Sequence, residues 1–507
     1  MKFLASDLLE GRGPGTRGGQ LATEYLAAQF ALVGAKPAGD NGTYFQAVPL
    51  IGVETQPDAQ LSAARGGRQV EFKWLEEFVG SDARQRPSED LDAEAVFVGH
   101  GIVAPEFNWD DFKGADVRGK ILVLFTNEPP SEDPAFFGGR ALTYYGRWTY
   151  KYEEAARRGA AGAILIHKTD MASYGWDVVR NSWSGERAYL RGGSEPRLKL
   201  AAWVQLAIAQ QVATTSGQNL DKLMEQARSR DFRPVPLPFR VQAHMVNKVR
   251  PFDSENVVAM LPGSDPKFKD QAVLYTAHFD HLGITQTPSG PAIYHGAIDN
   301  ATGCAVLMEI ARAYARSAVK PKRSIIFASV TGEEQGLRGS EYLGQHPPVP
   351  AGDITLALNF DGVAPYGIPE ELEAVGSERT TFYPTVETTA KDFNMKITPD
   401  SNPSAGFYYR SDHFSLARVG IPAFSLNEGL KYEGHPREWG EQVEKEYNQK
   451  HYHQPSDQYD LTWNFAGDAK MARFGFALGW QAANQPKEIR WQPGDEFEAA
   501  RKASERR

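Results

Sequence analysis

AVLYTA, residues 272–277, is an unbroken run of mostly apolar residues, and two similar runs follow it, RSIIFASV at 323–330 and ITLALNF at 354–360. Such runs without alternation are typical of strands buried on both faces, as in parallel or mixed sheets. Between the first two runs, CAVLMEIARAYARS at 304–317 has the spacing of an amphipathic helix. We therefore predict an α/β fold with a mixed, mostly parallel central sheet flanked by helices, to which GIPAFSL at 420–426 adds a strand.

The composition is that of an ordinary globular protein. Of the 507 residues, 41% are hydrophobic and 23% are charged, values close to the averages for folded domains. The net charge of −9 argues against nucleic-acid binding, which requires a basic surface. The single cysteine, Cys304, excludes an intrachain disulfide and a thiolate zinc site. The apolar runs fall far short of the roughly 20 residues that span a bilayer, so we expect no integral membrane segment.

The region between 48 and 250 has a different pattern from the rest of the chain. Short β-rich runs alternate there with polar and proline-containing stretches, and one helix-then-strand unit stands out, EEAARRGAAGAILIH at 153–167. We predict a catalytic domain made of residues 1–47 and 251–489, with the 48–250 region as an insertion. Residues 490–507 are predicted to form a charged C-terminal tail.

Acidic residues and histidines follow the apolar runs, at the ends of the predicted strands. Open α/β sheets bind ligands at this carboxyl edge. The residues of interest are His278, Asp280, Asp299, Glu333, Glu334, Asp361 and His453. Each has an ordinary explanation, such as a core histidine or a helix-capping aspartate, but these do not explain why three strands all end in acids or histidine. Two histidines and three carboxylates suffice for two zinc ions that share one carboxylate.

Six motifs in this chain resemble those of the di-zinc aminopeptidases of metallopeptidase family 28, and they occur in the family's order. The motifs are AHFDHLG (277–283), GAIDNATG (296–303), VTGEEQGLRGS (330–340), NFDG (359–362), RSDHFSLARVGIPAF (410–424) and YHQPSD (452–457). The opening FLASDLLEGRGPGTRGG (3–19) resembles the start of the family's bacterial members. The resemblance covers essentially the whole chain and implies a zinc exopeptidase fold.

The resemblance also implies two zinc ions held by five residues. Asp299 would bridge both ions, His278 and Asp361 would complete the shell of one, and Glu334 and His453 would complete the other. All five residues offer oxygen or nitrogen donors, which suit Zn²⁺ but also Mn²⁺ or Co²⁺.

Three further residues would take part in the reaction. Asp280 would fix the tautomer of His278 from behind, Glu333 would act as general base, and Tyr408 would stabilise the oxyanion. Tyr409 is adjacent to Tyr408 and is the alternative. His281 is expected to play a supporting or structural part. The predicted substrate contacts are Arg410, His413, Arg147 and Trp148.

The insertion has a resemblance of its own, because FVGHGIVAPEFNWDDFKGADVRGKILVLF at 97–125 is similar to part of a protease-associated domain. That domain would cover about residues 90–235. It would be either a stabilising appendage or a lid, and in the second case Arg147 and Trp148 would line the substrate path.

The function implied is that of a metal-dependent exopeptidase, which hydrolyses the N-terminal bond of peptide substrates with a di-zinc-activated water and a glutamate base. Three alternatives stay open: a carboxypeptidase that uses Arg410 to hold a free carboxylate, a glutaminyl-cyclase-like enzyme with one zinc, and a non-catalytic peptide-binding relative. The oligomeric state is also open. Family members usually carry an export signal, and this chain starts at its first structural motif. We therefore expect a periplasmic or secreted enzyme whose signal peptide has been removed, with a cytoplasmic enzyme as the alternative.

Overall fold

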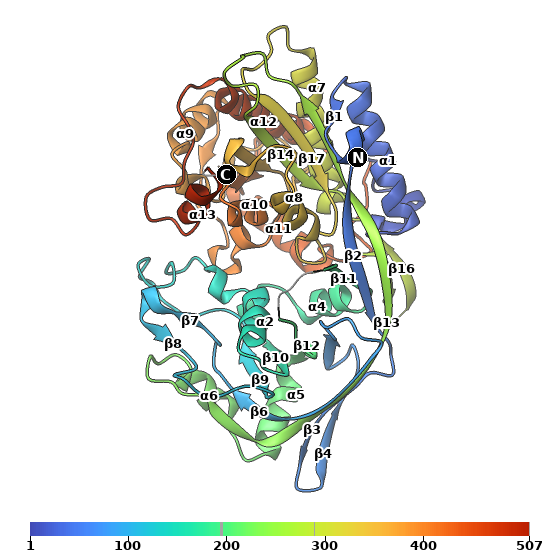
Figure 1. Cartoon of the computed structure of the whole chain (residues 1–507), viewed down its shortest axis with the longest axis vertical. Coiled ribbons are helices and arrows are strands. Elements are labelled where there is room, and N and C mark those ends of the chain that lie inside the picture. The colour runs from blue at the N-terminus through green and yellow to red at the C-terminus, as the bar shows by residue number, and fades with distance from the viewer. Residues whose placement is uncertain (193–195, 288, 506–507) are drawn as a thin grey trace. The chain divides into compact units, whose positions relative to one another are not determined.

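The computed structural model describes residues 1–192, 196–287 and 289–505, which divide into two compact units (Figure 1). The first unit consists of Met1–Leu50, Phe252–Ser401 and Arg410–Arg507, and the second of Ile51–Pro251 and Asn402–Tyr409. The chain therefore leaves the first unit twice, once for the long insertion and once for the short segment Asn402–Tyr409. The sequence did not predict this second excursion.

The sheet of the first unit is mixed and mostly parallel, as predicted. Its strands lie in the order β21 (Ala423–Ser425), β18 (Ile354–Asn359), β14 (Ala272–His278), β17 (Ser324–Val330) and β13 (Val235–Leu261). All neighbours are parallel except β13, which runs antiparallel to β17 through its last residues. The register sets His278 beside Val330 and Thr276 beside Asn359. The carboxyl ends of β14, β17 and β18 therefore meet at one edge of the sheet.

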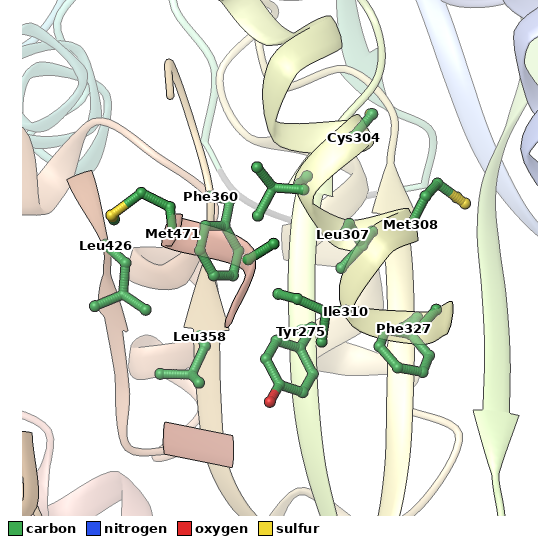
Figure 2. Packing of buried hydrophobic residues seen from close by; sticks show 14 of the residues in the cluster. Tyr275, Cys304, Leu307, Met308, Ile310, Phe327, Leu358, Phe360, Leu426 and Met471 are labelled. Carbon is green, nitrogen blue, oxygen red and sulfur yellow. The ribbon is translucent and has the colours of Figure 1, made fainter. Parts of the chain in front are cut away.

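Two long helices cover β14 and form the core of the first unit with it. In α7 (Gly303–Arg316), buried residues recur at the i, i+3, i+4 and i+7 positions Cys304, Leu307, Met308 and Ala311, which is the apolar stripe of a helix packed on a core. Figure 2 shows Leu307 and Ile310 of this helix beside Tyr275 of β14. The second helix, α12 (Ala466–Asn484), packs against both α7 and β14.

The remaining elements of the first unit surround this core. The helices are α1 (Arg17–Leu32), α8 (Arg338–Gln345), α9 (Tyr383–Asp392), α10 (His413–Arg418), α11 (Arg437–Lys450) and α13 (Glu498–Ser504). The short strands are β1 (Lys36–Pro37), β15 (Gly283–Thr287), β16 (Gly290–Tyr294), β19 (Glu371–Glu373), β20 (Lys396–Ile397) and β22 (Asn427–Glu428). Strand β2 (Phe45–Thr55) begins in this unit and ends in the other, as β13 does in the opposite direction.

The second unit has its own sheet and its own buried apolar clusters. Its sheet contains, in order, β6 (Ser88–Phe97), β9 (Ile121–Phe125), β10 (Gly162–His167), β12 (Leu200–Gln205) and β5 (Phe78–Ser81). The other strands are β3 (Gln60–Arg65), β4 (Arg68–Phe72), β7 (Val103–Ala104), β8 (Trp109–Asp110) and β11 (Arg187–Leu190). The helices are α2 (Trp148–Arg157), α3 (Thr169–Ala172), α4 (Trp176–Trp183), α5 (Leu206–Thr215) and α6 (Leu220–Gln226). Its resemblance to a protease-associated domain stays a prediction.

The predicted tail at 490–507 forms a helix over part of its length. Residues Glu498–Ser504 make up α13, and Arg501 is buried because its guanidinium donates hydrogen bonds to the carbonyls of Ala351 and Ile354. The charged composition suggested a tail because the local sequence does not indicate that Arg501 binds the carbonyls of Ala351 and Ile354. Arg506 and Arg507 lie outside the described residues. Among the described helices, none combines the length and hydropathy that a membrane crossing requires.

A close approach between α12 and β14 gives a test of this core. The hydroxyl of Tyr275 donates a hydrogen bond to the carbonyl of Gly475 at 2.9 Å, and a Cβ on Gly479 would lie 1.6 Å from the same hydroxyl oxygen. We expect Gly479→Ala to lower the free energy of unfolding by about 1–3 kcal/mol, because the core must shift to admit the methyl group. Calorimetric unfolding measures the effect. The control is Gly175→Ala, where the added Cβ meets nothing within 4 Å; equal melting temperatures for both variants would contradict the expectation.

Candidate metal centre

Asp299 presents its two carboxylate oxygens to two different histidines. Oδ1 lies 3.3 Å from Nε2 of His278, and Oδ2 lies 3.3 Å from Nε2 of His453. His278 ends β14, whereas His453 comes from a loop far along the chain. This is the arrangement that a carboxylate bridging two cations requires.

Each histidine also faces a second carboxylate. Nε2 of His278 is 3.1 Å from Oδ1 of Asp361, which follows β18. Nε2 of His453 is 2.9 Å from Oε2 of Glu334, which follows β17. The structure thus brings together all five predicted metal ligands, in two groups that share Asp299.

Two sets of three residues could each hold a divalent metal ion, and in the second set His281 stands in the place of His453. One ligand atom each of His278, Asp299 and Asp361 lie within 4.8 Å of one another. The same holds for His281, Asp299 and Glu334. All these donors are imidazole nitrogens or carboxylate oxygens, the ligands that zinc prefers where no thiolate is present.

His281 lies closer to the second group than the sequence suggested. Its Nδ1 contacts Oε1 of Glu334 at 2.5 Å, while the other oxygen of Glu334 faces His453. The signal was present in the motif AHFDHLG, where a second histidine follows His278 by three residues. Its contact with Glu334 depends on the turn after β14, which the motif alone does not define.

The charges in this centre depend strongly on one another. Burial lowers the pKa of His278, but Asp361 and the neighbouring acids outweigh it and leave the pKa well above its usual value. The pKa of His453 rises to about 10, because Glu334 and Asp299 outweigh the effect of burial. Without cations, both imidazoles therefore hold protons that neutralise the carboxylates. Metal binding must release these protons, which makes metal affinity fall at low pH.

Asp457 holds the backbone that leads into Asp299. Its carboxylate accepts hydrogen bonds from the N–H groups of Ile298 at 3.0 Å and Asp299 at 3.1 Å. Gly296 permits the same turn: its φ is +54°, and a Cβ there would lie 2.1 Å from the Asp299 carbonyl oxygen. These contacts orient the Asp299 carboxylate through its backbone.

Asn300 and Ser411 hold the loop that carries Asp361. The side-chain amide of Asn300 donates to the Phe360 carbonyl at 2.9 Å, and its oxygen accepts from the N–H of Gly362 at 3.1 Å. The hydroxyl of Ser411 donates to Oδ2 of Asp361 at 2.5 Å. Ser411 therefore orients the carboxylate of Asp361.

Asp280 binds the backbone of Glu333, the predicted base. The N–H of Glu333 donates to Oδ1 of Asp280 at 3.2 Å. Asp280 was predicted to hold His278 through its carboxylate, but that oxygen is 3.8 Å from Nδ1 of His278, and the closer acceptor is the Asp280 backbone carbonyl at 3.2 Å. Nδ1 of His278 therefore faces Asp280, while Nε2 faces Asp299 and Asp361.

Glu333 is poised to hold a proton. Burial raises its pKa well above the usual value, against the opposing effect of His278, and the carboxylates of Asp361 and Glu334 raise it further. Cations bound beside it would lower that pKa, because a nearby positive charge favours the ionised carboxylate.

The remaining predicted site residues fall into two groups. Arg410 and His413 belong to the first unit, where His413 is buried at the start of α10. Tyr408 belongs to the second unit with the segment Asn402–Tyr409, as do Arg147 and Trp148. Trp148 packs edge-on against Trp183 at 6.1 Å between ring centroids.

Comparisons with known proteins agree with this centre. The model for peptidase family M28 matches residues 256–474, which contain all five predicted ligands. Leupeptin-inactivating enzyme 1 of Streptomyces exfoliatus is 26% identical over 252 residues, which cover 48% of this chain and 51% of that protein. A probable zinc metalloprotease of Pyricularia oryzae is 37% identical over 127 residues, or 25% of this chain and 24% of that protein. The chain thus spans about half or less of these curated relatives.

A similar fold is found in a solved structure, the aminopeptidase from Aneurinibacillus sp. strain AM-1. The TM-score is 0.54 with 19% sequence identity, and the match covers 97% of this chain and 94% of the other. At this identity the likeness concerns the fold alone. It confirms the fold expected from the motifs, and the family match over residues 256–474 agrees with the resemblance of those motifs.

The two histidines around Glu334 should differ in metal binding. His453 faces both Asp299 and Glu334 through one nitrogen, so we expect His453→Gln to lose metal from the second group. His281 contacts the other oxygen of Glu334, so we expect His281→Gln to retain metal with about 10–100-fold weaker affinity, as for residues that orient a ligand. Metal content after dialysis and competition with a chelator measure both effects. Metal loss in His281→Gln with full retention in His453→Gln would reverse the assignment.

Proposed function

We propose that this chain, which carries a peptidase family M28 domain, is a zinc aminopeptidase that removes N-terminal residues from peptides. One observation supports it above all others: the two oxygens of Asp299 face histidines of two separate donor groups. A carboxylate shared in this way suits two zinc ions that lie close together. Two such ions can stabilise both the attacking and the leaving group of a hydrolysis.

The residues then have distinct tasks. Two bound zinc ions would lower the pKa of a water molecule and polarise the scissile carbonyl. The carboxylate of Glu333 accepts the proton of that water and later delivers it to the departing amine. Asp280 holds the backbone of Glu333 in place. Stabilisation of the developing negative charge by the hydroxyl of Tyr408 stays a prediction from the motif.

The acidic character of the centre favours a substrate with a free amine. Five carboxylates, those of Asp280, Asp299, Glu333, Glu334 and Asp361, lie in or beside it. Arg410 supports the carboxypeptidase alternative. Burial raises the pKa of Tyr452 well above its usual value, and the positive charge of Arg410 opposes this rise; the Tyr452 ring stacks on that of His453 with 4.0 Å between centroids. The guanidinium of Arg410 could hold a free carboxylate instead.

A matched set of substrates separates these two readings. We expect aminoacyl chromogenic amides to be hydrolysed and their N-acetylated counterparts to lose most of that activity, because acetylation removes the positive charge that the acidic centre attracts. Initial rates on both sets measure the difference. Peptides blocked at the amino end but cut from the carboxyl end would establish a carboxypeptidase instead, and Arg410→Gln should then abolish that cleavage.

The neighbours Glu333 and Glu334 give the sharpest test of the chemistry. Glu333→Gln preserves shape but cannot accept a proton, so we expect full zinc content and a fall in kcat of about 10²–10⁴-fold. The loss should fall on kcat more than on KM, since substrate contacts remain. Glu334→Gln is the matched control, because it changes the same atoms one residue away and should lower zinc content. Near-normal turnover in Glu333→Gln would show that another group is the base.

A further inference from the structure

Arg12 is fully buried, and its guanidinium is occupied by backbone carbonyls. Its side chain is 0% exposed and donates hydrogen bonds to the carbonyl oxygens of Phe279, Leu4, His295 and Gly296, at 2.5–2.8 Å. An arginine presents its donors in a planar fork, and here the fork joins three segments of backbone through four carbonyls.

The partners of Arg12 lie beside the metal ligands. Phe279 stands between His278 and Asp280, and Gly296 stands three residues before Asp299. One guanidinium therefore ties the loop after β14 to the loop before α7. These two loops supply the histidine of one donor group and the carboxylate shared by both.

The backbone of Arg12 is itself unusual. Its φ is +52°, in the left-handed region that disfavours residues with a side chain. Such outliers persist where the surrounding contacts define them and often accompany functional sites. The four carbonyl contacts account for the presence of an arginine where the backbone alone would favour glycine.

The positive charge of Arg12 also faces the acidic centre. Burial lowers the pKa of Arg12, while the carboxylates of Asp280, Asp457 and Asp299 raise it. An arginine keeps its charge even when buried. It therefore offsets some of the repulsion among these acids without competing for the Asp299 oxygens that face the histidines.

We propose that Arg12 is a positioning residue for the metal centre, whose guanidinium sets the spacing between the His278 and Asp299 loops and thereby the affinity for zinc. This role rests on the zinc centre proposed above but not on the peptidase reaction. Arg12→Lys keeps the charge and removes the fork, because one ammonium group cannot reach four carbonyls in this geometry.

The chain offers a matched control in Arg323. This arginine is also 0% exposed, and it donates to the carbonyls of Ala482 at 3.2 Å and Gln485 at 2.6 Å, at the end of α12. Arg323→Lys therefore removes the same kind of buried fork away from the metal ligands. Both variants are titrated with zinc against a chromophoric chelator, and both are melted after chelation.

We expect both substitutions to lower the melting temperature of the chelated protein, and only Arg12→Lys to weaken zinc affinity, by about tenfold or more. Arg12→Gln serves as a second variant that keeps hydrogen-bond donors without charge. Unchanged zinc affinity in Arg12→Lys, or equal losses in Arg12→Lys and Arg323→Lys, would overturn the proposal. So would failure of both Arg12 variants to fold while Arg323→Lys folds, since Arg12 would then serve the fold alone. Lack of zinc binding by the unaltered chain would instead refute the proposed function.

Discussion

The contact between Asp299 and two histidines is the constraint on which the centre depends. Each oxygen of this carboxylate faces a different imidazole at 3.3 Å, so the loop before α7 must lie between the end of β14 and a loop near the C-terminal end of the unit. Several carboxylates crowd the same place and repel one another unless cations or protons intervene. Metal binding and the local structure are therefore coupled, as in sites where ligand geometry forms only in the folded chain.

A layer of hydrogen bonds around the ligands keeps this geometry. Asp457 holds the backbone of Asp299, Ser411 holds the outer oxygen of Asp361, and the backbone carbonyl of Asp280 holds His278. Such contacts orient ligands that would otherwise rotate out of position. Arg12 adds hydrogen bonds from the N-terminal end of the chain. Residues from distant parts of the sequence therefore hold the loops that carry the predicted ligands.

Nothing in the sequence indicated that the short segment Asn402–Tyr409 joins the insertion. Tyr408, the predicted oxyanion group, belongs to the second unit, although Ser401 and Arg410 on either side of its segment belong to the first. Within the second unit, the N–H of Leu142 donates to the carbonyl of Pro403 at 2.9 Å, and the ring of Tyr144 lies 5.9 Å from that of Tyr409. These contacts hold the segment that carries Tyr408 within the second unit.

Much of the fold was readable from the sequence because its signals are local. Unbroken apolar runs marked β14, β17 and β18, and acids or histidine at their ends marked where His278, Glu334 and Asp361 would meet. The sequence alone did not determine that His281 contacts Glu334, that the Asp280 carboxylate binds the N–H of Glu333, or that the segment with Tyr408 joins the other unit. These features depend on side-chain directions and on backbone groups brought together from distant loops. Arg12 shows the same limit: a local pattern cannot reveal four carbonyl partners that only the tertiary structure assembles around one guanidinium.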